Sequence, residues 1–311
     1  MGGTGKPTAA YSSWRAAVAL GIAALSSGCG LSDAPILDPK GPIALAERGL
    51  LFTAILVMLI VVVPVFVLAV GFTWRYRASN NKARYEPDWS YSSRIDGVIW
   101  LVPALIVAAL GVHVWIYTHK LDPYKRLASS VPPIEVEVVA QDWKWLFIYP
   151  KQEIAVVNRL VFPSGTPLSL RITSDTVMNS FFIPALGGQI YAMAGMQTRL
   201  NLLAFEPGRF MGRNVQYSGG GFADQHFEAI ATPPEEFNAW VEKVKQSANK
   251  LDVATYCALA KPSRKHPVTS YSTVERNLFD RIVAKYAAGR SSAEKLVSNR
   301  PATASSLCSD D

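Results

Sequence analysis

The chain has 311 residues, of which 50% are hydrophobic, with a mean hydropathy of +0.15 and a formal net charge of +7. This composition is too apolar for an ordinary soluble protein and too mixed for a chain buried wholly in lipid, so part of it is expected in a membrane and part in water. The basic residues do not form one stripe, and no basic-aromatic motif accompanies them, which argues against nucleic-acid binding.

The N-terminus has the layout of a secretory signal peptide, predicted over residues 1–28. A short apolar stretch, Ala16 to Leu25, follows Lys6 and Arg15 and leads into small residues. Cys29 follows Gly28, which resembles the lipobox of bacterial lipoproteins, and we therefore expect lipidation at Cys29. Ser26 stands where an aliphatic residue is usual, so a chance cysteine beside an ordinary cleavage site is the alternative.

Two longer apolar stretches, 50–74 and 95–118, are predicted to span a membrane. The first has 25 residues without a charge, and at about 1.5 Å per residue it exceeds the ~30 Å hydrocarbon core. The connecting segment, 75–94, carries five basic residues, so the positive-inside rule predicts that it lies in the cytoplasm and that 29–49 and the C-terminal part lie outside. His113, inside the second span, is expected to be a satisfied interfacial residue rather than a ligand.

From residue 119 the composition changes to short β-type runs bounded by turn residues, which predicts an all-β sandwich over 119–232. The runs are Ile134–Val139, Leu168–Thr173, Arg199–Ala204 and Phe227–Thr232. Pro233-Pro234 then opens a helical, aromatic-rich module over 233–290, with helices predicted at 235–248 and 274–288. Residues 291–311 are Ser- and Ala-rich and are predicted to be disordered. Pairing Cys257 with Cys308 would have to tether this tail, so no disulfide is predicted there.

A signal peptide, a two-helix hairpin and an exported β-domain resemble subunit II of the haem–copper respiratory oxidases. In its copper-containing members, a cupredoxin domain holds two copper ions through an early histidine and a later Cys-x-Glu-x-x-Cys-x-x-x-His-x-x-Met run. Pro207-Gly208, Gly212 and Gly219 fix the register here. The six corresponding positions carry Asn179, Asn214, Gln216, Ser218, Phe222 and Gln225. None can replace the copper ligand it stands for, so we expect a pocket that is packed or hydrogen-bonded without metal.

A subunit II without copper resembles the cytochrome bo-type ubiquinol oxidases, and the match extends over nearly the whole chain. The matching motifs are 37–41 (LDPKG), 74–80 (WRYRASN), 142–145 (DWKW), 179–184 (NSFFIP) and 189–199 (QIYAMAGMQTR). The resemblance implies a membrane-anchored, cupredoxin-like subunit without cofactor in a proton-pumping ubiquinol oxidase of the bacterial inner membrane. It also implies that the haems and copper belong to subunit I, that subunit I and smaller membrane subunits are its partners, and that cytochrome c is not.

Two rival functions follow from the same segments. A cytochrome c oxidase subunit II fails on all six ligand positions. A free-standing, membrane-anchored periplasmic scaffold or binding lipoprotein with a cupredoxin fold explains the export signal and the β-domain, but it gives no reason for the second span.

Two further sites are expected from the resemblance. Asp96, seven residues before Pro103, matches an acidic residue at the mouth of a proton pathway into subunit I; the alternative is a helix-start acid favoured by the helix dipole. Trp143 and Trp145 match a Trp-x-Trp strand that accepts electrons from cytochrome c in copper-containing relatives. With no copper behind them, we interpret both as core and interface aromatics.

Overall fold

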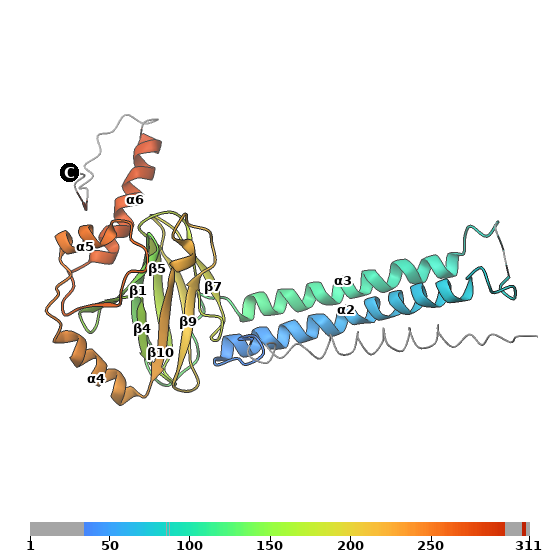
Figure 1. Ribbon diagram of the computed structural model, residues 1–311, viewed down its shortest axis with the longest axis horizontal. Coiled ribbons are helices and arrows are strands. Elements are labelled where there is room, and N and C mark those ends of the chain that lie inside the picture. Colours follow the sequence, from blue (N-terminus) through green and yellow to red (C-terminus); the bar gives the residue numbers. More distant parts are fainter. Residues whose placement is uncertain (1–33, 85, 87, 296–306, 309–311) are drawn as a thin grey trace, which may run out of the picture.

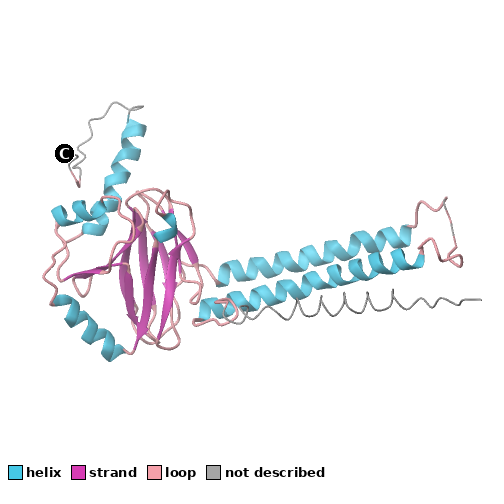
Figure 2. Ribbon diagram, viewed as in Figure 1, coloured by secondary structure: helices cyan, strands magenta, loops and turns pink. Residues whose placement is uncertain are grey.

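The computed structural model describes residues 34–84, 86, 88–295 and 307–308 (Figures 1 and 2). The predicted signal peptide and Cys29 lie outside the described residues, so both remain predictions. The described chain forms a two-helix hairpin, a β-sandwich and a C-terminal group of helices, which confirms the predicted fold class.

The hairpin consists of α2 (Pro42–Arg75) and α3 (Ser93–Lys120), each long and apolar enough to cross a membrane. Figure 1 shows the two helices side by side, extending away from the sandwich. Helix α2 begins eight residues before the predicted span, because Pro42 suits the first helical turn and the Glu47 carboxylate accepts a hydrogen bond from the β-domain. Pro64 and Pro103 both lie inside continuous helices.

The start of α2 is fixed to the sandwich by hydrogen bonds. Lys40 N donates to Ala185 O at 2.8 Å, and Phe205 N donates to Lys40 O at 2.9 Å. Glu47 Oε1 accepts from Gly188 N at 3.0 Å. The anchor and the β-domain are therefore joined by direct contacts as well as by the chain between α3 and the first strand.

The sandwich has a six-stranded sheet in the order β11-β3-β2-β1-β5-β8 and a five-stranded sheet in the order β4-β10-β9-β6-β7. Its strands are β1 (Ile134–Gln141), β2 (Lys144–Tyr149), β3 (Ile154–Val157), β4 (Arg159–Pro163), β5 (Leu168–Ser174), β6 (Asn179–Phe182), β7 (Gln189–Ala192), β8 (Thr198–Leu202), β9 (Gly208–Asn214), β10 (His226–Thr232) and β11 (Thr269–Tyr271). Three of the four predicted runs lie within strands, and the run Arg199–Ala204 extends two residues past the end of β8. The other seven strands were not predicted. Of these, β2 and β3 are buried along their whole length and show no polar alternation.

Aromatic side chains fill the space between the sheets. Trp145 packs edge-on against Phe181 with ring centroids 5.4 Å apart, and Phe181 stacks on Phe227 at 5.0 Å. Val138 faces this core, whereas Val139 faces the other side of the sheet, where the C-terminal helices cover it. The larger sheet is therefore buried on both faces.

The C-terminal module contains α4 (Pro234–Lys245), α5 (Val253–Ala260) and α6 (Leu278–Lys295), with α5 and α6 on the side of the sandwich away from the hairpin (Figure 1). Helix α5 and strand β11 were not predicted. The prediction of a disordered tail from residue 291 is wrong at its start, since α6 continues to Lys295.

The expectation that Cys257 and Cys308 do not pair is also wrong. The two cysteines form a disulfide with Cα atoms 5.7 Å apart, and Leu307 is buried beside α5 and α6. The described end of the tail is thus attached to the helical module, because apolar burial and a covalent bond outweigh its polar composition.

Candidate functional site

The fold brings the six positions that were predicted to replace copper ligands to one end of the smaller sheet. Asn179 opens β6 and Asn214 closes β9, and these two strands pair. Gln216 and Ser218 follow in the next loop, Phe222 begins a short 3₁₀ helix (Phe222–Asp224), and Gln225 precedes β10.

Four of these positions join in one buried hydrogen-bond network centred on Asn214. Its Nδ2 lies 2.7 Å from Asn179 Oδ1, 2.9 Å from Gln225 Oε1 and 3.1 Å from Ser218 Oγ. An amide nitrogen has two hydrogens, so the two shortest contacts take them. Ser218 Oγ donates instead to Gln225 Oε1 at 2.8 Å. Neutral amide and hydroxyl side chains therefore bond to one another at this end of the sheet.

Asn214 also closes the loop that follows it. Its Oδ1 accepts from the backbone nitrogen of Ser180 at 2.8 Å and from that of Gln216 at 3.0 Å. One side-chain oxygen thus satisfies two backbone donors, one on β6 and one in the loop after β9, so this asparagine holds the loop against the neighbouring strand.

Gln216 and Phe222 lie outside the network of side chains. Gln216 takes part through its backbone nitrogen alone, and Phe222 packs against Tyr217 with ring centroids 5.8 Å apart. Amide and hydroxyl oxygens are hard, weak ligands for copper, and phenylalanine offers none, so the residues present do not fit a copper pair. Within the described residues, no group of three or more His, Cys, Asp or Glu side chains could hold a metal ion.

Trp143 covers the loop that carries Ser218. Its backbone has φ +63°, and its indole Nε1 donates to Ser218 O at 3.1 Å. The guanidinium of Arg264, from the C-terminal module, lies 5.5 Å from the ring centroid. A side chain at Gly221 would collide with the indole, so glycine is required there. Trp143 lies at the interface between the Ser218 loop and the C-terminal module, and Trp145 lies in the core, which agrees with the interpretation from the sequence.

Lys144, between these tryptophans, is a buried cation that the sequence analysis did not single out. Its ammonium donates to Lys261 O at 2.8 Å and to Ser263 Oγ at 2.7 Å. Burial lowers the pKa of Lys144 to about 8, and the nearby Asp142 carboxylate partly opposes this shift. The lysine therefore attaches the segment before β11 to the sandwich.

Asp175 forms a second set of contacts between the sandwich and the C-terminal module. These contacts were not predicted from the sequence. Its carboxylate accepts from Tyr256 Oη at 2.6 Å and from Lys285 Nζ at 3.0 Å, and Tyr286 Oη donates to its backbone oxygen at 2.6 Å. Burial and the neighbouring carboxylate raise the pKa of Tyr256. Asp175 follows Ser174, whose Oγ accepts from the Asn179 amide at 3.3 Å. Helices α5 and α6 thus hold the loop that leads to the first site position.

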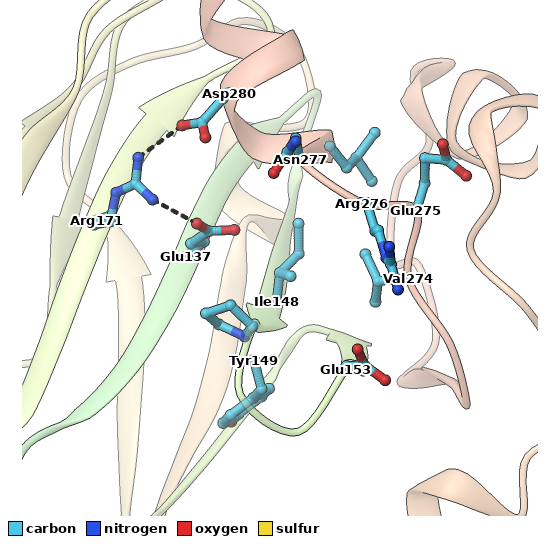
Figure 3. Close-up of a pocket in the computed structure, with 12 residues that line it drawn as sticks. Glu137, Ile148, Tyr149, Glu153, Arg171, Val274, Glu275, Arg276, Asn277 and Asp280 are labelled. Carbon is cyan, nitrogen blue, oxygen red and sulfur yellow. Dashed lines mark hydrogen bonds and ion pairs between the residues drawn. The ribbon is translucent and has the colours of Figure 1, made fainter.

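A cavity of about 280 Å³ lies where the larger sheet meets the segment before α6 (Figure 3). Arg171 bridges it, with 2.7 Å to Glu137 and 2.7 Å to Asp280. Burial raises the pKa of Glu137, and the Arg171 charge opposes that rise. Because these charges satisfy one another, the bridge serves to attach α6 to the sheet.

Asp96 lies in the first turn of α3, at the end of the hairpin far from the sandwich. Its backbone nitrogen donates to Ser92 O at 2.9 Å. The structure does not bring it near the Asn214 network. His113 lies farther along α3, with its ring 4.6 Å from that of Tyr117, and its Nε2 has no partner within the described part of the chain.

Comparison with known proteins matches residues 105–225 to the cytochrome c oxidase subunit II periplasmic domain and 245–290 to the COX aromatic rich motif. The cytochrome bo(3) ubiquinol oxidase subunit 2 of Pseudomonas putida is 52% identical over 282 residues, covering 90% of this chain and 89% of the relative. Ubiquinol oxidase subunit 2 of Acetobacter aceti is 52% identical over 269 residues, covering 86% of each. The solved periplasmic domain of cytochrome oxidase subunit II from Bradyrhizobium japonicum matches at 20% identity and a TM-score of 0.36, covering 38% of this chain and 96% of that one.

Proposed function

The chain belongs to the ubiquinol oxidase subunit 2 family of the haem–copper oxidases, and we propose that it is the non-redox subunit of a proton-pumping oxidase in an aerobic respiratory chain. The Asn214 network carries this proposal. It replaces a copper pair with neutral side chains bonded to one another, so this domain offers no acceptor for electrons from a soluble donor. Electrons would then pass from ubiquinol to the haems and copper of subunit I.

The hairpin supports a role as membrane anchor for the complex. Large apolar side chains are exposed along both helices, including Phe66, Trp74, Leu105 and Trp115, and these would face lipid or subunit I. The basic segment between the helices favours the cytoplasmic side, which places the sandwich in the periplasm and the hairpin in the inner membrane. In this arrangement the sandwich covers the outer face of subunit I.

Asp96 would contribute to proton uptake at the cytoplasmic end of the hairpin. A half-buried carboxylate at a hydrated helix end can take up a proton from water and pass it on. Its position in the first turn of α3 also suits a simple helix-start acid, so a turnover measurement decides between the two roles.

Metal and haem analysis of the detergent-purified complex tests the proposal. We expect this chain to co-purify with a haem-bearing, multi-spanning partner, and after the subunits are separated we expect the copper to remain with that partner. Stoichiometric copper on this chain would overturn the non-redox assignment. Isolation as a haem-free monomer would instead favour the free-standing scaffold lipoprotein, which the relatives do not support.

A further inference from the structure

One corner of the outer face of the larger sheet carries polar and charged side chains on three neighbouring strands. Glu135 on β1 lies opposite Ser169 on β5, which lies opposite Asn201 on β8. In the next row, Arg171 on β5 lies opposite Arg199 on β8. The residues between these positions belong to the core, so all five side chains stand on the face away from the other sheet.

The loop after α3 forms a wall beside this corner, and together they line a pocket of about 230 Å³. Asn201 fixes the loop, since its backbone nitrogen donates to Pro123 O at 3.2 Å and its Nδ2 donates to Pro123 O at 3.0 Å and to Lys125 O at 3.2 Å. Tyr124 and Arg126, on either side of Lys125, complete the lining. Three strands and a hydrogen-bonded loop therefore shape this pocket.

The two arginines that face each other across β5 and β8 differ in their partners. Arg171 is paired with Glu137 and with Asp280, each at 2.7 Å. Throughout the residues that the structure describes, neither Arg199 nor Arg126 forms an ion pair or a side-chain hydrogen bond. Like charges directly opposite each other on neighbouring strands are destabilising. This corner of the sheet therefore carries positive charge that the described chain does not compensate.

The pocket has an excess of positive charge and of hydrogen-bond donors. Three arginines and one glutamate line it, which gives the lining a net charge of +2. The hydroxyl groups of Ser169 and Tyr124 also belong to lining residues, and neither forms a hydrogen bond within the described ranges. Glu135 lies two strands away from Asn201, about 10 Å across the sheet, so the positive charge is concentrated at the β8 side.

We propose that this pocket binds a phosphate group, with Arg199 and Arg126 as the charged contacts and Ser169 as a neutral donor. A phosphate carries a charge of about −1 to −2 and several acceptor oxygens, which match the net charge and the donors of the lining. Planar guanidinium groups recognise such oxygens through paired hydrogen bonds. A carboxylate, with one charge and two oxygens, would balance only part of this lining. Both free phosphate and a phospholipid headgroup carry the group.

Phosphate binding by the full-length chain, purified in detergent with the subunits that accompany it, tests the assignment. Inorganic phosphate is titrated calorimetrically in a phosphate-free buffer, and acetate is titrated in parallel. Phosphatidylglycerol is then offered to the delipidated protein, and bound lipid is counted by native mass spectrometry. Arg199→Gln removes the central charge. Arg213→Gln is its matched control, because Arg213 is exposed on β9 of the other sheet and has no ion pair among the described residues.

A second pair of variants tests the sign of the electrostatic effect. Glu135→Gln removes the only carboxylate of the lining, so it should tighten phosphate binding by roughly twofold or more. Glu236→Gln, at an exposed position of α4, is the matched control. A gain of affinity is informative because damage to the fold would weaken binding.

We expect saturable binding of phosphate, weakened by about tenfold or more in Arg199→Gln and unchanged in both controls. Binding of inorganic phosphate would identify a soluble ligand, and Arg199-dependent binding of phosphatidylglycerol alone would identify a headgroup. Absence of both up to about 10 mM would overturn the proposal. Equal binding by Arg199→Gln and Arg213→Gln, or acetate binding as tightly as phosphate, would also overturn it.

Loss of a partner subunit from Arg199→Gln, with phosphate binding unchanged, would show that the arginine holds a carboxylate of that partner instead. Co-purification with a haem-bearing subunit is scored separately, so failure of the phosphate site leaves the oxidase assignment intact.

Discussion

Asn214 and Asn179 lie on different strands, and the side-chain amide of Asn214 donates to that of Asn179 at 2.7 Å. Both side chains are buried, at 4% and 0% exposed, and both stand at positions that the sequence analysis predicted to replace copper ligands. The Asn214 amide thus joins β6, β9 and the following loop by hydrogen bonds, at the positions where the sequence predicted that copper ligands had been replaced.

Replacing Asn214 with alanine is expected to destabilise the protein by about 2–4 kcal/mol. The substitution leaves the buried backbone nitrogen of Ser180 without its acceptor and Asn179 Oδ1 without its donor, and it removes one of the two donors to Gln225 Oε1. Thermal unfolding of the detergent-purified protein measures this. Gln216→Ala is the matched control, because that side chain lies outside the network, and it should change stability by less than about 0.5 kcal/mol. Equal melting of the two variants would contradict the structural role of the network.

Replacing Asp96 with asparagine is expected to slow quinol-dependent oxygen consumption several-fold without loss of assembly. Asparagine keeps the size of the side chain but cannot take up a proton at this position. Asp96→Glu should retain most of the turnover, and Asp88→Asn, in the exposed loop before α3, serves as control. Unchanged turnover and proton pumping in Asp96→Asn would leave only the helix-start role.

Replacing Trp143 with phenylalanine is expected to leave quinol oxidation nearly intact. The substitution loses the indole bond to Ser218 O, and we expect a loss of stability of about 1 kcal/mol. Trp145→Phe, in the buried core, should lower stability by roughly 1–3 kcal/mol, also without a specific effect on turnover. A selective loss of electron transfer in Trp143→Phe would show that this surface carries electrons.

The buried ammonium of Lys144 should make stability depend on pH. Its pKa is about 8 in the folded protein, below the usual value of 10.5. Between these two values the unfolded chain binds a proton that the folded protein has released, so the free energy of unfolding rises with pH through this window. The cost of burying the charge is fully present below pH 8.

Chemical unfolding at pH 7 to 9.5 should show a gain on the order of 1–2 kcal/mol that is missing in Lys144→Met. Comparing the two proteins removes the contributions of other groups. A parallel pH dependence in both would mean that Lys144 is not the source.

The Cys257–Cys308 disulfide should stabilise the C-terminal module by about 2–4 kcal/mol, because it closes a loop with a sequence separation of 51 residues. Reduction of the purified protein and the substitution Cys257→Ser should lower the melting temperature by similar amounts, and Cys308→Ser should match Cys257→Ser. Both cysteines should resist thiol labelling until a reductant is added. Labelling of either one in the untreated protein would show that the pair is open.

The sequence by itself determined the two long apolar helices and the lack of copper-binding residue types at the six predicted ligand positions. Spanning depends on the length of an apolar run, which is a local property, so 50–74 and 95–118 were recognisable although α2 in fact begins at Pro42. The absence of thiolate and imidazole at six aligned positions is likewise a matter of residue identity. Alternating runs such as Ile134–Val139 identified strands wherever one face of a strand is more polar than the other.

Only the tertiary structure decided which side chains bond to one another around Asn214 and how the C-terminal module is attached to the sandwich. The bonds from Asn214 to Asn179, from Tyr256 to Asp175 and from Lys144 to Ser263 join residues separated by 35, 81 and 119 positions. Such pairs leave no periodic signal in the sequence, because each polar side chain is ordinary by itself and is stabilised in the interior only by a partner that folding brings within bonding distance.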